Sequence, residues 1–77
     1  MKIKVIVTLK KGVLDPQGKA IQQTLNNMSF DKVTDIRQGK FFEIEVKEHD
    51  ETKAKSLVDD MCKKLLANLV IEDYIIV

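Results

Sequence analysis

The strict alternation of apolar and polar residues near the N-terminus constrains the fold most. Successive side chains of a β-strand point to opposite faces, so a period of two predicts a strand with one buried face. We therefore expect a strand over residues 2–10, with Ile6 as the one apolar residue on its wetter face. The apolar residues on the other face are Ile3, Val5, Val7 and Leu9.

A second pattern, at helical spacing, predicts the layer that covers this strand. Asp50 is the expected N-cap and Glu51 suits the helix dipole in the first turn, while Asn68 is expected to close the helix in a left-handed conformation. The apolar residues between them recur at i, i+3 and i+4, so we expect one buried stripe. The stripe consists of Ala54, Leu57, Val58, Met61 and Leu65.

The stretch from Gly12 to Ile21 joins the first strand to an earlier helix. Asp15 is the expected N-cap of that helix and Pro16 its first residue, since proline loses nothing by lacking an N–H there. Gly18 inside a helix costs about 1 kcal/mol relative to alanine. It therefore indicates a close approach, either of another chain's backbone or of the chain's own sheet. The apolar stripe is narrow, and the helix is expected to end between Asn26 and Ser29; the stripe consists of Ile21, Leu25 and Met28.

The remaining patterns complete the predicted fold. We expect strands over residues 32–38, 41–47 and 70–77, with Gln38-Gly39 as a tight turn that makes a hairpin of the first two. The order β-α-β-β-α-β is that of the ferredoxin-like fold. The sequence thus predicts a two-layer α+β sandwich over one domain, residues 1–77, with a four-stranded antiparallel sheet and both helices on one face.

Length and composition limit the classes of function. A chain of 77 residues with one cysteine has a small core and no disulfide, so we expect at least a homodimer. The 13 basic and 12 acidic residues nearly cancel, which argues against binding to nucleic acid or an anionic membrane. No signal peptide or membrane-spanning run is present, and a lone free cysteine suits a reducing compartment, so we expect a cytoplasmic protein.

No set of residues with the composition of a catalytic or metal site stands out. Cys62 and His49 have no second cysteine or histidine to complete a metal site, and neither Ser29 nor Ser56 has an evident base. We expect Cys62 to be a buried or half-buried thiol and His49 a solvated turn residue. Lys10-Lys11-Gly12 precedes a helix N-terminus, but the glycine spacing matches no phosphate-binding motif, so an anion site there is the less favoured hypothesis.

Other functions are known for the same topology. RNA-binding domains of this kind stack bases on aromatic residues of the central strands, and here the first strand has no aromatic residue. An acylphosphatase-type enzyme needs an arginine in the first loop, whereas the only arginine is Arg37. A small regulatory module of the ACT type, which binds a small ligand, remains open as the alternative.

Three segments resemble the PurS family, in the same order and spacing over essentially the whole chain. They are residues 10–21 (KKGVLDPQGKAI), 33–40 (VTDIRQGK) and 62–74 (CKKLLANLVIEDY). The chain departs from the family where Leu69 replaces a usual proline and where Met28-Ser29-Phe30 replaces a Leu-Gly-Phe-like turn.

The resemblance implies a role in de novo purine biosynthesis. PurS is the small subunit of phosphoribosylformylglycinamidine synthase, an ATP-dependent ligase complex that converts formylglycinamide ribonucleotide, ATP and glutamine to the amidine, ADP, phosphate and glutamate. The implied partners are a second copy of the chain, the synthetase subunit PurL and the glutaminase subunit PurQ. ATP and magnesium are expected in the synthetase, and no catalytic, cofactor-binding or metal-binding residue is expected in this chain.

The resemblance further implies a subunit that bridges the other two and helps ammonia to pass between them. We expect partner contacts at the start of the first helix, at the predicted hairpin and near the last strand. The expected contact residues are Asp15, Pro16, Gln17, Gly18, Lys19, Arg37, Lys40, Asn68, Glu72, Asp73 and Tyr74.

Overall fold

The fold is an antiparallel sheet of three strands with two helices, described over residues 1–77 in a computed structural model. The elements in chain order are β1 (Lys2–Leu9), α1 (Pro16–Asn27), β2 (Gly39–Glu45), α2 (Glu51–Met61), the π-helical turn η1 (Cys62–Leu66) and β3 (Glu72–Ile76). β1 is the central strand, paired on one side with β2 and on the other with β3. The outer edges of β2 and β3 are therefore both free of strand partners.

The predicted two-faced character of β1 is confirmed. Ile3, Val5 and Val7 are buried on one face, in a cluster with residues of α2, η1 and Ala67, whereas Ile6 lies on the opposite face. There it is level with Phe41 on β2 and Ile75 on β3, and these two side chains are 57% and 64% exposed. One face of the sheet is thus covered by α2, and the other is open.

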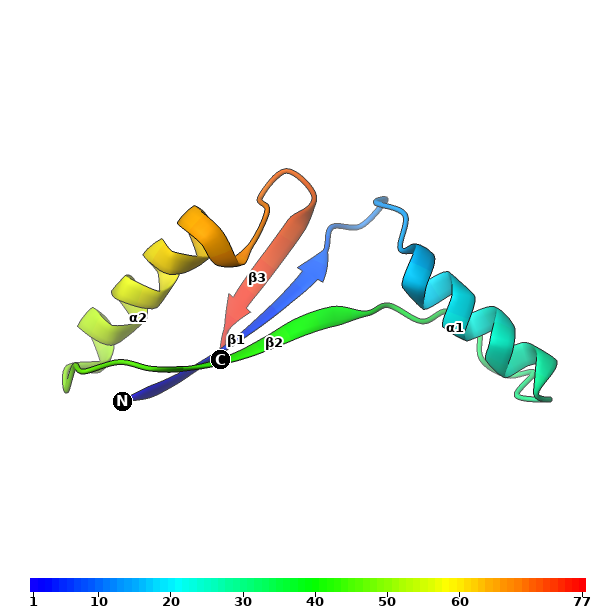
Figure 1. The fold of residues 1–77 in the computed structure, drawn as a ribbon, viewed down its shortest axis with the longest axis horizontal. Coiled ribbons are helices and arrows are strands. Elements are labelled where there is room, and N and C mark those ends of the chain that lie inside the picture. The colour runs from blue at the N-terminus through cyan, green and yellow to red at the C-terminus, as the bar shows by residue number, and fades with distance from the viewer.

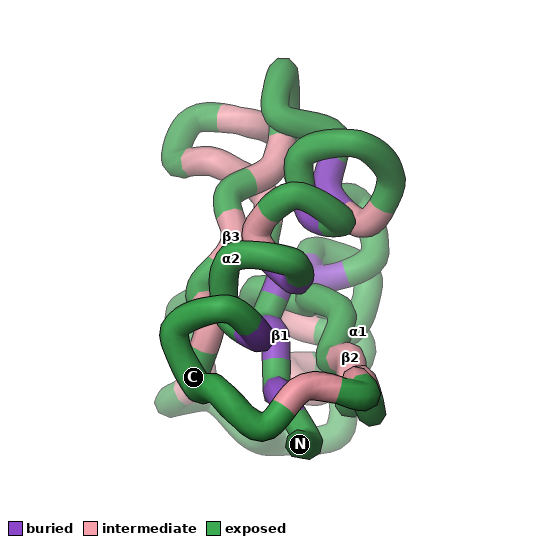
Figure 2. The backbone as a smooth tube through the Cα atoms, turned by 90° about the vertical axis from the view of Figure 1, so that its left-hand side faces the viewer, coloured by how far each residue is buried: buried purple, intermediate pink, exposed green.

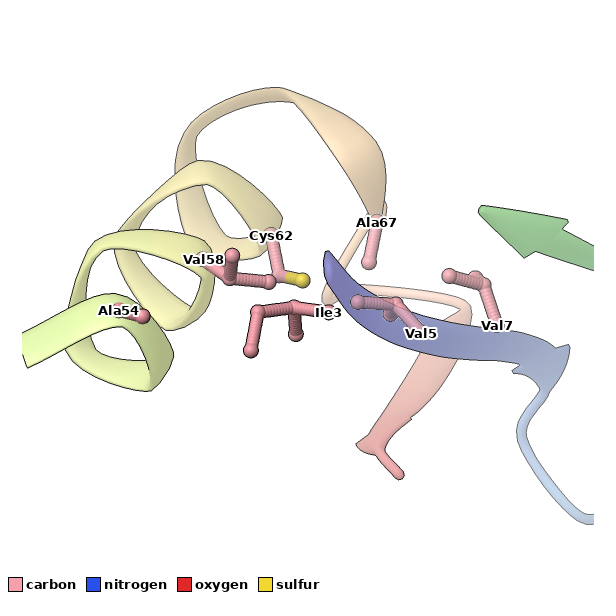
Figure 3. Close-up of a cluster of buried hydrophobic side chains, with 7 residues drawn as sticks. All are labelled: Ile3, Val5, Val7, Ala54, Val58, Cys62 and Ala67. Carbon is pink, nitrogen blue, oxygen red and sulfur yellow. The ribbon is translucent and has the colours of Figure 1, made fainter. Parts of the chain in front are cut away.

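The core lies between this covered face and α2. Figure 3 shows side chains of α2 and η1 directed toward those of β1, in a cluster of seven buried residues. The cluster consists of Ile3, Val5, Val7, Ala54, Val58, Cys62 and Ala67. Asp50 is the N-cap of α2, as predicted, because its carboxylate accepts from the N–H groups of Thr52 and Lys53.

The prediction that one buried stripe runs along the second helix is wrong for three of its five residues. Ala54 and Val58 are fully buried, but Leu57 is 49%, Met61 36% and Leu65 83% exposed. The buried residues recur every four positions, at Ala54, Val58 and Cys62. Leu57, Met61 and Leu65 each follow one of them by three positions and therefore lie on the side of the helix.

The second helix also ends differently from the prediction. It widens into the π-helical turn η1 and stops at Ala67, which has extended backbone. Asn68 does not adopt a left-handed conformation, since Ser29 is the only non-glycine residue with a positive φ. Instead the Asn68 side chain accepts from the N–H of Val70 and organises the turn before β3.

An arm projects from this compact part. We define the arm as residues 16–38, which comprise α1 and the segment that returns to β2. Figure 1 shows the arm extending away from the sheet, at the opposite end of the molecule from α2. The molecule measures 49 × 23 × 14 Å, and Gly18 is the only buried residue of α1. In Figure 2 the buried positions gather where β1 and α2 lie together.

The arm accounts for the main errors in the predicted fold. The α+β class and five of the six elements are present, but the sheet has three strands, not four. Residues 32–38, predicted as a strand, form none, and Gln38-Gly39 is not a hairpin turn because the chain runs straight into β2. Gly39 instead allows close strand pairing, since a Cβ there would lie 2.5 Å from the Val7 carbonyl oxygen. The two helices do not lie side by side on one face of the sheet (Figure 1).

Candidate interaction site

The start of α1 is tied to the returning segment of the arm through one carboxylate. Asp15 caps the helix as predicted, its Oδ1 accepting from the Gly18 N–H at 2.9 Å. Its Oδ2 accepts from the N–H of Gln38 at 2.8 Å. These hydrogen bonds, that from Gln38 first, together with the charge of Arg37 hold the pKa of Asp15 below its ordinary value. We call Asp15, Gly18, Ile36, Arg37 and Gln38 the joint.

The joint explains the glycine inside α1. A Cβ on Gly18 would lie 2.2 Å from the Ile36 carbonyl oxygen, so no side chain fits. The close approach predicted at this glycine is confirmed, and the approaching backbone belongs to the chain itself. It comes from the returning segment, however, rather than from the chain's sheet or from another chain.

Arg37 fixes the arm to the end of β1. Its Nη2 donates to the carbonyl oxygens of Leu9 and Lys10 at 2.7 and 3.1 Å. The joint borders a surface cleft of about 300 Å³ lined by Gly12, Val13, Leu14, Asp15, Lys19, Asp35, Ile36 and Arg37. The cleft carries charges of both signs, and the cap already occupies the helix N–H of Gly18, so this geometry gives no support to an anion site.

Several other residues predicted for partner contact have partners within the chain. Lys40 pairs with Glu72 at 3.6 Å, and Asp73 pairs with Lys10 at 2.7 Å. Glu72 also accepts from the Asn68 N–H at 2.7 Å. These contacts join the start of β3 to its neighbours.

Tyr74 joins β3 to α2. Its hydroxyl donates to the Asp59 carboxylate, which also pairs with Lys63 at 3.0 Å. The hydrogen bond from Tyr74 lowers the pKa of Asp59, and the same bond raises the pKa of Tyr74.

Pro16, Gln17 and Lys19 are exposed. Contact with a partner stays a prediction for all eleven residues.

The two residues considered for metal or thiol chemistry lie as predicted. Cys62 is fully buried, and burial raises the pKa of its thiol, with a smaller contribution from Asp59. His49 is exposed in the turn before α2. No cluster of three or more histidine, cysteine or acidic residues is positioned to hold a metal ion. No helix is long and apolar enough to cross a membrane.

The sequence-based prediction missed two exposed apolar surfaces, one on each helix. The first, the α1 stripe, consists of Ile21, Leu25 and Met28, and Ile21 and Met28 are 43% and 61% exposed. The second, the α2 flank, consists of Leu57, Met61 and Leu65. Each surface is hollowed: Ala20, Ile21, Thr24 and Leu25 line about 250 Å³ on α1, and Leu57, Asp60, Met61, Lys64, Leu65 and Leu66 line about 390 Å³ on α2.

The signal for these surfaces was present in the sequence. The apolar residues of α2 form two adjacent rows, one with small side chains that pack on the sheet and one with large side chains. In this structure the small row packs on the sheet and the large row is exposed, and an exposed apolar patch of this kind is typical of an interaction surface.

Comparison with known proteins gives a consistent family over the full chain. The family model for PurS, phosphoribosylformylglycinamidine (FGAM) synthase, matches residues 2–77. The chain belongs to the PurS family. The PurS subunit of FGAM synthase from Bacillus subtilis is 51% identical over 73 residues, which cover 95% of this chain and 86% of that protein. The corresponding subunit from Methanocaldococcus jannaschii is 48% identical over 73 residues, covering 95% of this chain and 88% of that one.

Solved PurS structures share the fold, including its extended form. The B. subtilis PurS crystal structure superimposes with a TM-score of 0.88 at 49% identity, covering 99% of this chain and 94% of that chain. A chain in the structure of PurLQS from Thermotoga maritima gives a TM-score of 0.91 at 32% identity, covering 99% and 93%. The predicted resemblance to PurS is therefore confirmed. The chain is a PurS subunit of FGAM synthase, an enzyme of purine biosynthesis.

The departure from the PurS pattern at the end of α1 has a structural consequence. Ser29 has φ +77°, a left-handed conformation that glycine adopts without strain. The N–H groups of Ser29 and Phe30 bond to the carbonyl oxygens of Asn26 and Leu25, which is the Schellman pattern. Serine thus occupies the position where the family resemblance places glycine.

Proposed function

We propose that this chain is the non-catalytic subunit of FGAM synthase that bridges the glutaminase PurQ and the synthetase PurL in the cytoplasm. In that complex formylglycinamide ribonucleotide, ATP and glutamine become the amidine, ADP, phosphate and glutamate. The synthetase binds ATP and magnesium, the glutaminase releases ammonia, and this chain assists the passage of ammonia between them. It acts as a homodimer or a larger assembly of its own copies.

The observation that carries this proposal is the likeness, over 99% of the chain, to a chain in the T. maritima PurLQS structure. The surfaces of the molecule agree with a role in assembly. Apolar side chains on α1, on α2 and on the open face of the sheet are 36–83% exposed, and none of these surfaces has a covering element within the chain. The ACT-type alternative is set aside because the whole chain matches the PurS family.

The test is reconstitution of the complex from its purified parts. Glutamine-dependent formation of the amidine is measured with synthetase and glutaminase, with and without this chain, and we expect a large gain on its addition. Turnover with ammonium chloride in place of glutamine is the control, because free ammonia does not require transfer from the glutaminase. Equal glutamine-dependent rates with and without the folded chain would refute the proposal.

A further inference from the structure

The cleft beside the joint is bounded by two separate stretches of the chain. One is the connection from β1 to α1, residues 12–15, the other is the returning segment, residues 35–37, and Lys19 of α1 completes the lining. Its volume of about 300 Å³ lies at the lower limit of ligand pockets, so the cleft suits a small molecule. Half of the lining residues are charged, and the others are apolar residues and one glycine.

The charges of the cleft balance one another. It has two carboxylates, Asp15 and Asp35, and two cations, Lys19 and Arg37. An anion or a cation alone would therefore meet repulsion as well as attraction, which is the reason that the cleft does not suit a simple anion. A small molecule that carries one charge of each sign would find a partner for both.

The joint holds one charge of each sign in place. Both oxygens of Asp15 accept from backbone N–H groups, and Arg37 donates through Nη2 to two backbone carbonyl oxygens. A guanidinium has five N–H donors, so Nη1 and Nε of Arg37 remain available to a ligand carboxylate. Because Arg37 is already fixed, less free energy is lost in ordering it when a ligand binds.

The other two charged side chains of the cleft have no ionic partner in the chain. Lys19 and Asp35 line the same cleft, yet neither forms an ion pair. The N–H groups of Gly12 and Leu14, in the connection from β1, also have no backbone acceptor. The cleft therefore combines two free charges of opposite sign with spare hydrogen-bond donors.

We propose that this cleft binds a free α-amino acid. The carboxylate of the ligand accepts from Arg37 and Lys19, and its ammonium group donates to Asp35. An α-amino acid carries both charges on one carbon atom, so a site of this size can satisfy the two together. A ligand of about ten non-hydrogen atoms is expected to bind with a Kd on the order of 1 mM. The inference goes beyond the proposed function and does not depend on it.

The first test is titration of the isotopically labelled chain with L-glutamine, followed by amide chemical shifts. Glutamine is neutral outside its α-groups, so it isolates their contribution. We expect saturable shifts at residues 12–19 and 35–37, with a Kd on the order of 1 mM, and none at α2. N-acetylglutamine lacks the ammonium group and glutamine α-amide lacks the carboxylate, and each is expected to bind about fivefold more weakly.

The second test removes the free charges of the cleft one at a time. Asp35→Asn and Lys19→Gln should keep the helical circular dichroism of the wild type, because neither side chain has an ion-pair partner in the chain. Each is expected to raise the Kd for glutamine about threefold to fivefold. The matched controls Asp31→Asn and Lys32→Gln remove the same charges from exposed residues of the arm outside the cleft, and should leave the Kd unchanged.

A double-mutant cycle then tests the assigned contact between Asp35 and the ammonium group. Asp35→Asn should weaken the binding of glutamine but not that of N-acetylglutamine, which has no ammonium group to lose. Equal effects on the two ligands would overturn the assignment of this contact and with it the proposed site.

Three other outcomes would overturn the proposal. They are the absence of saturable shifts up to about 20 mM glutamine, equal affinities for glutamine and both analogues, and an equal loss of affinity in Asp31→Asn and Asp35→Asn. None of them bears on the proposed function, because reconstitution measures turnover of the complex and not the binding of an amino acid to this chain.

Discussion

Gly18→Ala provides a direct test of the joint, because two effects of known size oppose each other there. In a free helix alanine is favoured over glycine by about 1 kcal/mol, so helix propensity alone predicts stabilisation. In the joint the new methyl group would lie 2.2 Å from the Ile36 carbonyl oxygen and 2.8 Å from Asp15 Oδ2. Non-bonded contacts this short do not occur. The Ile36 carbonyl oxygen belongs to the backbone, so the methyl group fits only if the returning segment moves away from α1.

The expected result is a net loss of stability. Overpacking a close contact costs about 1–3 kcal/mol, and an approach of 2.2 Å to a backbone oxygen belongs to the upper part of that range, about 2–3 kcal/mol; the propensity gain offsets only about 1 kcal/mol of it. We expect the variant to unfold at lower urea concentration, with a loss of about 1–2 kcal/mol, which corresponds to several degrees in Tm for a domain of this size. The measurement is urea denaturation followed by the helical signal at 222 nm.

The matched control is Gln23→Ala, an exposed position of the same helix where alanine adds no contact. It should be neutral or slightly stabilising. If Gly18→Ala were as stable as the wild type, or gained stability as Gln23→Ala does, the joint would not hold the returning segment against α1, and the close approach would have to be given up as the reason for this glycine.

The remaining predictions concern the end of α1, the acid titration of the joint and the contact between β3 and α2. Ser29→Gly should stabilise the chain by about 1 kcal/mol in urea denaturation because it relieves the left-handed strain, and a loss of stability would contradict the Schellman assignment. Since the folded pKa of Asp15 is lowered, its contribution is complete above the unfolded value near 3.8 and is lost as the pH falls through the folded value. The helical signal of α1 should therefore decrease below about pH 4, and Asp15→Asn should flatten that transition; identical acid transitions in the two proteins would argue against the charge as its cause. Tyr74→Phe should lower the denaturation midpoint and return the pKa of Asp59, followed by NMR, toward its ordinary value, because the variant loses the hydroxyl that donates to this carboxylate; an unchanged pKa would show that the bond is absent in solution. The folded pKa of Tyr74 is raised, so in the wild type the same contribution is present below about pH 10 and is lost as the pH rises through the folded value.

Local chemistry was sufficient to predict most of the elements. The alternation in β1, the caps at Asp15 and Asp50 and the position of Pro16 depend on neighbours a few residues away, and each is found as predicted. Gly18 was correctly associated with a close approach. The identity of the approaching backbone was not predictable, because Ile36 is 18 residues away and its pattern indicated a strand in the sheet.

The burial of the helices could not be predicted from their periodicity. An apolar row at helical spacing shows that a surface will be covered, and it does not state by what. Leu57 and Leu65 satisfy the pattern as well as Val58 does, yet only Val58 contacts the core of this chain. The error lay in assigning both rows to one sheet, when that sheet has room for one.

The missing fourth strand has a similar origin. Residues 33–38 were expected to pair because of their composition, and composition is unaffected by whether the partner strand belongs to the same chain. The connection decides this: no turn lies at Gln38-Gly39, so residues 33–38 run straight into β2 and do not fold back to pair with it. The joint at Asp15 and Gly18 holds the start of α1 against residues 36–38, so that the helix and the returning segment stay in a fixed relation.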